Sequence, residues 1–396
     1  MQYTVDIRAF LKTMALFFAP VFALVGFGIF LAIASGEVTT LQSVVDKQAR
    51  PEEYLFARRV VSEETAKYKY FNVQQQDVDV LALGSSRVLE LRQEVFGGAY
   101  IFYNAGNMLI SLRDLIDFID ILKEEDAPDI IILGVDMWWF DSSRIETRAF
   151  AREHVRGEEA YNWRSYLYAS RHLFTALLKD PSYVAAVFTR KDPLTNNHAI
   201  GIAAIENGDG FRRDGSRQYG TYVRMMREDP SYVDRETNPV VERAENGYPP
   251  FELESSFDER GVALLDEFLE KAQKRGITVI GVAGPFASDA YQAIIHSHYA
   301  PFASAFSEQI PPVFTKRGFP FFDFSDISAW GLEDTYMLDG FHATETGISI
   351  LFTHILDALC SGDIFEDCAS LRARLTNVLE DPRTTPAEMY WEAALD

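Results

Sequence analysis

The chain reads VDVLALGSSR from residue 78 to residue 87, and this stretch decides the fold. Apolar residues dominate positions 78–83, as in a buried β-strand, and Gly84, Ser85 and Ser86 then interrupt the run. The residues that follow have a helical pattern. A strand, a glycine turn and a helix in this order are typical of a parallel α/β fold, where ligands bind beyond the carboxyl ends of the strands. We therefore expect Ser86 at that edge.

Further strands and helices alternate along the chain on both sides of this stretch. Apolar spacing predicts helices over residues 112–122, 264–269 and 344–359. Continuous apolar runs are typical of parallel strands covered on both faces. The predicted fold is a three-layer α/β/α, flavodoxin-like domain. Its remaining strands are expected at Tyr100–Tyr103, Ile130–Val135, Ile277–Val282 and Phe321–Phe324.

A polar, arginine- and glycine-rich segment interrupts this alternation and suggests an insertion over the ligand-binding edge. The predicted division has five parts: a cytoplasmic stub and transmembrane anchor at 1–36, a stalk at 37–75, the α/β domain at 76–150 and 251–362, an inserted lid or acceptor-binding segment at 151–250, and a peripheral acidic tail at 363–396.

The N-terminal region predicts a single membrane anchor. Residues 14–34 are uncharged and almost wholly apolar, and at 1.5 Å per residue they cover about 30 Å, the thickness of a hydrocarbon core. Arg8 and Lys12 precede the run, so the positive-inside rule keeps the N-terminus in the cytoplasm and exports the rest. We expect a single-pass protein of the bacterial inner membrane with a periplasmic domain. The alternative is a signal peptide cleaved after the Ala-Ile-Ala sequence at 32–34.

Composition excludes some classes of function. Lysine and arginine total 37 against 59 aspartate and glutamate residues, a net charge of −22 that disfavours binding to nucleic acid. Two cysteines without a Cys-x-x-Cys motif give no zinc or iron–sulfur pattern. In an exported domain Cys360 and Cys368 can form a disulfide. The alternative is two free thiols.

Ser86, Asp339 and His342 are the candidate catalytic residues. A serine at a strand-to-helix turn is exposed beside helix N–H groups that can stabilise an oxyanion. It needs a base, and that base needs an orienting carboxylate. An aspartate three residues before a histidine, with Gly340 between, can fold back onto the imidazole. The alternative is that Ser86 and His342 only cap helices.

These motifs together resemble the SGNH/GDSL hydrolases. The resemblance covers roughly residues 76–145 and 255–360, with the Asp-x-x-His block as its most specific part. It implies a serine nucleophile and no metal or cofactor. The blocks that carry it are Gly84-Ser85-Ser86-Arg87, Asn104-Ala105-Gly106-Asn107, Gly134-Val135-Asp136-Met137 and Asp339-Gly340-Phe341-His342.

The resemblance also implies an oxyanion hole formed by the backbone N–H groups of Ser86 and Gly106, with Asn107 nearby. At position 136 the chain departs from the family, because Asp136 replaces an oxyanion-binding asparagine. An ionised carboxylate cannot donate a hydrogen bond. Either Asn104 or Asn107 then replaces it as the third oxyanion donor, or Asp136 is held protonated at that site. Otherwise Asp136 is a scaffold residue that accepts backbone N–H groups or pairs with an arginine such as Arg87 or Arg113.

Arginines and aromatic residues near the expected site are candidate substrate-binding residues. Aromatic faces stack on sugar rings, and guanidinium groups bind hydroxyl or anionic groups. The alternatives are an ordinary surface loop in the insertion and an apolar plug beneath it. The candidates are Arg87, Asp136, Trp138, Trp139, Arg217 and Tyr219.

A membrane anchor on such a domain is similar to the anchored partners of membrane-bound O-acyltransferases, namely the DltD-like proteins of teichoic-acid alanylation and the proteins of alginate acetylation. This similarity implies a multi-spanning O-acyltransferase partner and a glycan acceptor. A sugar hydroxyl as acceptor gives an O-acyltransferase, and water gives an esterase. The alternative class is a catalytically degenerate domain that binds glycan or a partner.

Overall fold

The computed structural model describes residues 7–148, 150, 163–360, 364–365 and 367–394. The chain forms two compact units, each built from two stretches of sequence. The first unit combines Met1–Glu63 with Glu158–Gly210, and the second combines Glu64–Gly157 with Phe211–Asp396.

The second unit is built on a five-stranded parallel sheet, as the sequence predicts. Its strand order is β3-β2-β4-β8-β9, which in chain order is 2-1-3-4-5, a common doubly wound arrangement. Every residue of the first three strands is buried, which explains their continuous apolar sequence. The strands are β2 (Val80–Gly84), β3 (Phe102–Gly106), β4 (Ile130–Gly134), β8 (Thr278–Ala283) and β9 (Phe321–Asp323).

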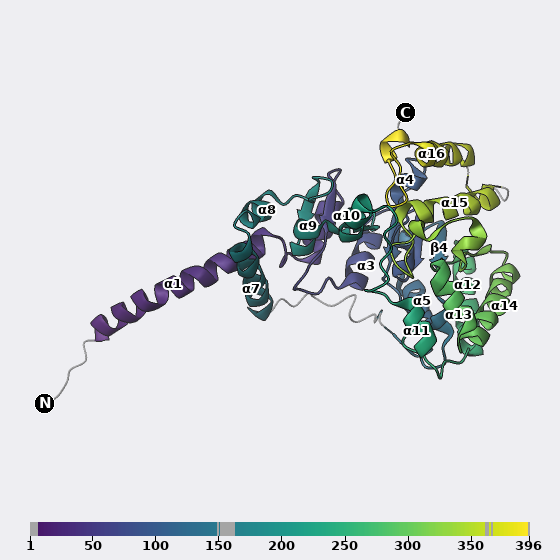
Figure 1. Ribbon diagram of the computed structural model, residues 1–396, viewed down its shortest axis with the longest axis horizontal. Helices are drawn as coiled ribbons and strands as arrows, with labels where there is room; N and C mark the ends of the chain where they lie inside the picture. Colours follow the sequence, from purple (N-terminus) through teal and green to yellow (C-terminus); the bar gives the residue numbers. More distant parts are fainter. Residues whose placement is uncertain (1–6, 149, 151–162, 361–363, 366, 395–396) are drawn as a thin grey trace. The chain divides into compact units, whose positions relative to one another are not determined.

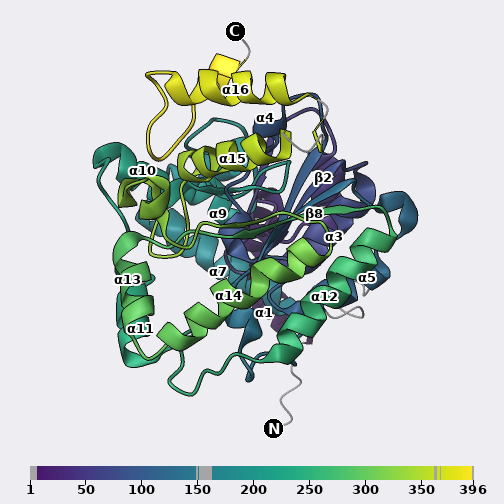
Figure 2. The ribbon, with the colours of Figure 1, turned by 90° about the vertical axis from the view of Figure 1, so that its right-hand side faces the viewer.

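Helices cover both faces of this sheet (Figure 2). A side chain at Gly281 of β8 would meet Phe314 of α14 (Ala300–Lys316), so α14 packs on one face. The neighbouring residue Val282 lines a small apolar cavity with α15 (Glu345–Cys360) on the other. The remaining helices of this unit include α3 (Thr65–Gln75), α4 (Gln93–Phe96), α5 (Leu112–Ile121), α10 (Gly220–Glu228), α11 (Val240–Asn246), α12 (Glu259–Lys274), α13 (Ser288–His296) and α16 (Cys368–Glu380).

The segment 151–250 is not one insertion in the structure. Its last part, residues 211–250, belongs to the α/β unit. They include β7 (Arg217–Tyr219), whose Arg217 N–H donates to the Leu89 carbonyl at 2.9 Å. Val240 and Ala244 of α11 are buried in the main core. Residues 151–162 lie outside the described residues.

The C-terminal segment also differs from the peripheral tail expected at 363–396. Leu371, Leu375 and Val378 of α16 are buried in the core, and α16 packs on α15 (Figure 2). Cys360 and Cys368 form a disulfide across these two helices. Since disulfides are typical of oxidising compartments, this bond indicates an extracytoplasmic domain.

The residues directly after the first helix form secondary structure with buried contacts, whereas the sequence predicts a stalk at 37–75. The buried Glu37 carboxylate accepts backbone N–H groups from Arg59, Val61 and Ile202 at 2.8–3.0 Å, and β1 pairs in parallel with β5. The elements of the first unit are α1 (Ile7–Ala34), α2 (Leu41–Gln48), β1 (Tyr54–Phe56), α7 (Trp163–Lys179), α8 (Tyr183–Thr189), β5 (His198–Ile200) and α9 (Ile202–Asn207). β6 (Asp209–Phe211) lies where the two units meet in sequence.

The N-terminal helix α1 is long and apolar enough to cross a membrane (Figure 1). It has 28 residues, and most of its side chains are exposed. This arrangement agrees with the predicted apolar run at 14–34 and with either an anchor or a signal sequence.

Candidate active site

Ser86 lies at the turn that leaves β2, and glycine is needed just before it. Gly84 has a φ of +146°, and a Cβ there would lie 3.0 Å from the carbonyl oxygen of Gly134 on β4. Ser85 then caps the short 3₁₀ helix Ser86–Val88, because its Oγ accepts the Arg87 N–H at 3.3 Å. Ser85 therefore has the capping role, and the Ser86 hydroxyl is left for other contacts.

Ser86, His342 and Asp339 form one continuous hydrogen-bonded chain. Ser86 Oγ lies 2.8 Å from Nε2 of His342, and Nδ1 of His342 lies 2.9 Å from Oδ2 of Asp339. The Ser86 and His342 side chains are half-buried, and Asp339 is buried. The structure thus brings together all three predicted catalytic residues, from the end of β2 and from the loop before α15.

The charge on Asp339 fixes the direction of these hydrogen bonds. Burial alone would raise the pKa of Asp339, but hydrogen bonds from the His342 ring and from the backbone N–H groups of Phe341 and His342 outweigh it and hold that pKa below its ordinary value. An ionised Asp339 accepts the proton on Nδ1, which leaves Nε2 as an acceptor for the Ser86 hydroxyl. A general base needs this tautomer.

Asn238 supports the same carboxylate and was not expected from the sequence. Its side-chain amide donates to Oδ2 of Asp339 at 2.6 Å. The next helix, α11, holds the loop closely, since a Cβ at Gly340 would lie 2.4 Å from Val240. Nothing in the sequence marks Asn238, which is 101 residues from its partner.

Replacement of Asn238 by aspartate is expected to shift the acid limb of the pH–rate profile to higher pH. A second carboxylate beside Asp339 favours the imidazolium form of His342, and only neutral histidine acts as the base. Asn238→Ala is expected to lower kcat about 10- to 100-fold, because a hydrogen bond to a charged group is worth about 1.5–3 kcal/mol. The pH dependence of aryl-acetate turnover measures both effects.

Asn246→Asp is the matched control, because Asn246 is exposed at the end of α11 and donates only to the Glu242 carbonyl within the described residues. An unshifted profile in Asn238→Asp, or an equal shift in the control, would show that Asn238 does not act through the triad.

The predicted oxyanion donors differ in availability. Within the described residues, no hydrogen bond uses the Ser86 N–H. The Gly106 N–H already donates to Oδ1 of Asn104 at 2.8 Å. The Asn107 N–H donates to the carbonyls of Gly84 and Ser85 at 2.9 and 3.0 Å, which places Asn107 beside the nucleophile turn. Ser86 N–H is therefore the donor most free to bind an oxyanion.

Arg87 and Asp136 form a buried ion pair behind the nucleophile. Arg87 Nη1 lies 3.1 Å from Oδ1 of Asp136, and these residues are 6% and 2% exposed. Burial raises the pKa of Asp136 and lowers that of Arg87, and their mutual attraction opposes both shifts. Of the alternatives for Asp136, the structure shows the pairing with Arg87.

Arg87 also ties together the loops that hold the triad. Its guanidinium donates to the carbonyls of Phe341 and Pro285 at 3.3 and 2.7 Å, and it lies 4.0 Å from the ring centre of Phe286. One side chain thus joins the Ser86 turn to the loop after β8 and to the backbone next to His342. This makes Arg87 a positioning residue, in addition to its candidacy for substrate binding.

The two tryptophans after β4 lie in different environments. Trp139 is buried in the main hydrophobic core. Trp138 is half-buried and packs edge-on against Phe341, with ring centres 5.7 Å apart. Trp138 therefore lies next to the catalytic loop, whereas Trp139 packs inside the domain.

Tyr219 and Arg217 of β7 lie near the catalytic histidine. The Tyr219 and His342 ring centres are 6.3 Å apart, and the Arg217 guanidinium lies 5.2 Å from the Tyr219 ring centre. Both side chains are half-buried. The structure thus places these two predicted substrate-binding residues beside the triad.

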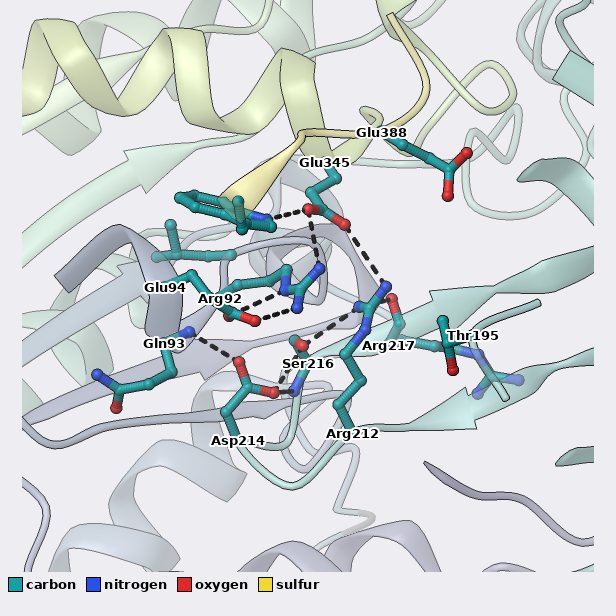
Figure 3. Close-up of polar contacts among 12 residues, drawn as sticks. Arg92, Gln93, Glu94, Thr195, Arg212, Asp214, Ser216, Arg217, Glu345 and Glu388 are labelled. Atoms are coloured by element: carbon teal, nitrogen blue, oxygen red, sulfur yellow. Dashed lines mark hydrogen bonds and ion pairs between the residues drawn. The ribbon is translucent and has the colours of Figure 1, made fainter. Parts of the chain in front are cut away.

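A network of charges holds the start of α15, just after His342 (Figure 3). Glu345 pairs with Arg92 at 2.9 Å and with Arg212 at 3.5 Å, and the Trp391 indole donates to it (Figure 3). Asp214 accepts the Gln93 N–H at 2.7 Å in the same network. These contacts fix the helix that follows the histidine.

Glu90 is close enough to this network for its charges to shift the pKa of Glu90. We expect this residue to make the free energy of unfolding depend on pH. Burial raises the pKa of Glu90 well above its ordinary value of 4.5, although Arg212 and Arg217 oppose the shift. The contribution of Glu90 to stability is fully present below the pKa that this side chain has in the unfolded chain. It is lost as pH rises through the higher pKa of the folded state, by up to about 1.4 kcal/mol per pH unit.

Glu90→Gln is therefore expected to flatten the decline in the free energy of unfolding above pH 4.5. Urea unfolding at several pH values, compared between the two proteins, measures the difference. Parallel curves for both proteins would contradict a neutral, buried Glu90.

Within the described residues, no group of three or more His, Cys, Asp or Glu side chains is arranged to hold a metal ion. Comparison of the chain with known protein families, curated proteins and solved structures found no match. Support for a function therefore comes from the arrangement of the side chains.

Proposed function

We propose that this chain is a serine-dependent O-acyltransferase or esterase with a flavodoxin-like SGNH-type domain. The hydrogen-bonded chain from Ser86 through His342 to Asp339 carries the proposal. Apolar helix α1 and the Cys360–Cys368 disulfide support a protein anchored in the inner membrane with its domain outside the cytoplasm.

The chemistry follows from the geometry of the triad. Ser86 Oγ attacks the acyl carbonyl carbon while Nε2 of His342 takes the hydroxyl proton. The Ser86 N–H stabilises the resulting oxyanion. Collapse of this intermediate breaks the bond to the leaving oxygen, which receives the proton from His342. An acceptor hydroxyl then attacks the acyl-serine with the same proton transfers and restores Ser86.

The acceptor is proposed to be a hydroxyl of a cell-envelope or exported polysaccharide, and the acyl group acetyl. Tyr219 and Arg217 beside His342 offer an aromatic face and a cation to a sugar. By the resemblance to anchored SGNH proteins, a multi-spanning membrane O-acyltransferase is proposed as the partner that supplies acyl groups.

A second candidate function is glycan or partner binding without turnover. Two observations favour it: the Gly106 N–H is already bonded to Asn104, and Asp136 stands where the related hydrolases have an asparagine donor. Fewer free donors would stabilise an oxyanion less well.

Trapping of an acyl-enzyme distinguishes the two candidates. The purified full chain is mixed with an aryl acetate, quenched in acid and digested, and we expect an acetyl group on Ser86 by peptide fragmentation. His342→Ala should prevent acetylation, whereas Ser85→Ala should retain it. An added oligosaccharide should then become acetylated if the enzyme is a transferase. No acetyl-Ser86 and no turnover would favour the binding function.

A further inference from the structure

Helices α7 and α8 pack against the C-terminal end of α1 within the first unit (Figure 1). At Gly28 of α1, a Cβ would lie 2.6 Å from the Phe174 ring and 2.8 Å from Ser170, so glycine permits this close approach. The Phe27 and Phe174 ring centres are 6.1 Å apart, and those of Phe30 and Phe188 are 5.9 Å apart.

These contacts lie inside the apolar run of α1. The run ends at Ala34, so Phe27 lies about 10 Å and Phe30 about 6 Å before its end along the helix axis. If residues 14–34 span the hydrocarbon core, their partners Phe174 and Phe188 reach the depth of the outer leaflet. Parts of α7 and α8 are then at the bilayer boundary.

The exposed surface of α7 and α8 is apolar on the side that continues from α1. Trp163, Leu167 and Leu178 share a helical face with Phe174 and are 67%, 38% and 85% exposed. Phe188 of α8 is 51% exposed. Side chains of this size, left uncovered beside an apolar helix, extend its apolar surface.

A basic stripe flanks this apolar face. Arg164, Arg171 and Lys179 are exposed, and α7 contains no aspartate or glutamate in a chain with a net charge of −22. Another side of α7 is buried in the core of the first unit, where Ala169 and Leu173 share a cluster with Leu31 of α1. An apolar face rich in Trp and Leu beside a basic face is typical of helices that lie in the membrane interface.

We propose that α7 and α8 form a second membrane contact, in which the apolar face of α7 is embedded in the outer leaflet and its basic stripe meets lipid phosphates. This inference rests on the part of the proposed function that keeps α1 as an uncleaved anchor. The occupant is the phospholipid bilayer, since the face is continuous with the surface of α1. The first unit is then held at the membrane by three helices instead of one.

Spin labels on introduced cysteines test this contact. The two native cysteines form a disulfide, so a single new cysteine is labelled selectively. Leu167→Cys and Leu178→Cys report on α7, and Leu253→Cys, at a leucine 68% exposed in the second unit, is the control. The full chain is reconstituted in vesicles of phosphatidylethanolamine and phosphatidylglycerol. Collision with oxygen and with an aqueous nickel chelate is then measured for each label.

Labels at 167 and 178 are expected to collide mainly with oxygen, with at least a several-fold lower nickel accessibility than the label at 253. Equal nickel accessibility at all three positions would overturn the contact. Mass measurement checks that residues 1–36 are retained, and their loss would also overturn the proposal. Neither readout depends on Ser86, so a failure here is distinct from a failure of the proposed chemistry.

Discussion

Ser86→Ala is expected to lower turnover of an aryl acetate by roughly 10³-fold or more. The substitution removes the nucleophile, while the fold should be unaffected because the side chain is half-buried and small. His342→Ala should have a similar effect, since the serine then has no base at 2.8 Å. The double variant should be no slower than either single variant, because residues that act as one unit lose their effects non-additively. Steady-state rates at one pH measure all three.

Ser85→Ala is the matched control for this series. Ser85 lies next to the nucleophile, caps the 3₁₀ helix and hydrogen-bonds the Asp136 side chain, so its loss is expected to lower stability by about 1 kcal/mol while the nucleophile and its base stay in place and most activity is kept. Asp339→Asn should cost less than Ser86→Ala but still orders of magnitude. Full activity in Ser86→Ala with a large loss in Ser85→Ala would move the nucleophile to Ser85.

Much of the sheet could be predicted because its strands are buried on both faces. Segments such as Ile130–Val135 and Ile277–Val282 are continuous apolar runs, and the observed strands β4 and β8 nearly coincide with them. The approach of Ser86 to the Asp339–His342 loop was also predictable. Ser86 directly follows the first predicted strand, and the Asp339–His342 loop lies between the last predicted strand and the last predicted helix, so both were expected at the edge where parallel strands end.

Other parts depend on contacts between distant residues that leave no local pattern. Asn238 reaches Asp339 from a segment without apolar periodicity, and its residue type alone is typical of any surface loop. The segment after α1 resembled a stalk in sequence because its buried apolar residues, such as Leu41 and Val44, are scattered among polar ones, and part of its backbone is held by the buried Glu37 carboxylate. The many charged residues of the C-terminal segment suggested a peripheral tail, although Leu371, Leu375 and Val378 give α16 an apolar face.

The buried pair of Arg87 and Asp136 is expected to give the largest loss of stability of any single change near the site. Arg87→Met keeps the length of the side chain but leaves a lone buried carboxylate at Asp136, and removal of one partner of a buried pair costs about 3–5 kcal/mol. It also removes the contacts to Phe341 and Pro285 that position the loop of His342. We expect low activity even at temperatures where the variant is folded. Urea unfolding and aryl-acetate turnover measure the two effects.

Asp136→Asn and the double variant decide what the carboxylate does. As a scaffold residue, Asp136→Asn should lower stability by about 1–3 kcal/mol and reduce activity with it. The double variant Arg87→Met/Asp136→Asn should be more stable than Arg87→Met alone, because no lone charge remains buried. Arg113→Met is the control, since Arg113 pairs with Glu146 at the surface and is expected to contribute no more than about 1 kcal/mol. An Asp136→Asn variant of unchanged stability and higher activity would place Asp136 at the oxyanion instead, because an amide there donates where a carboxylate repels.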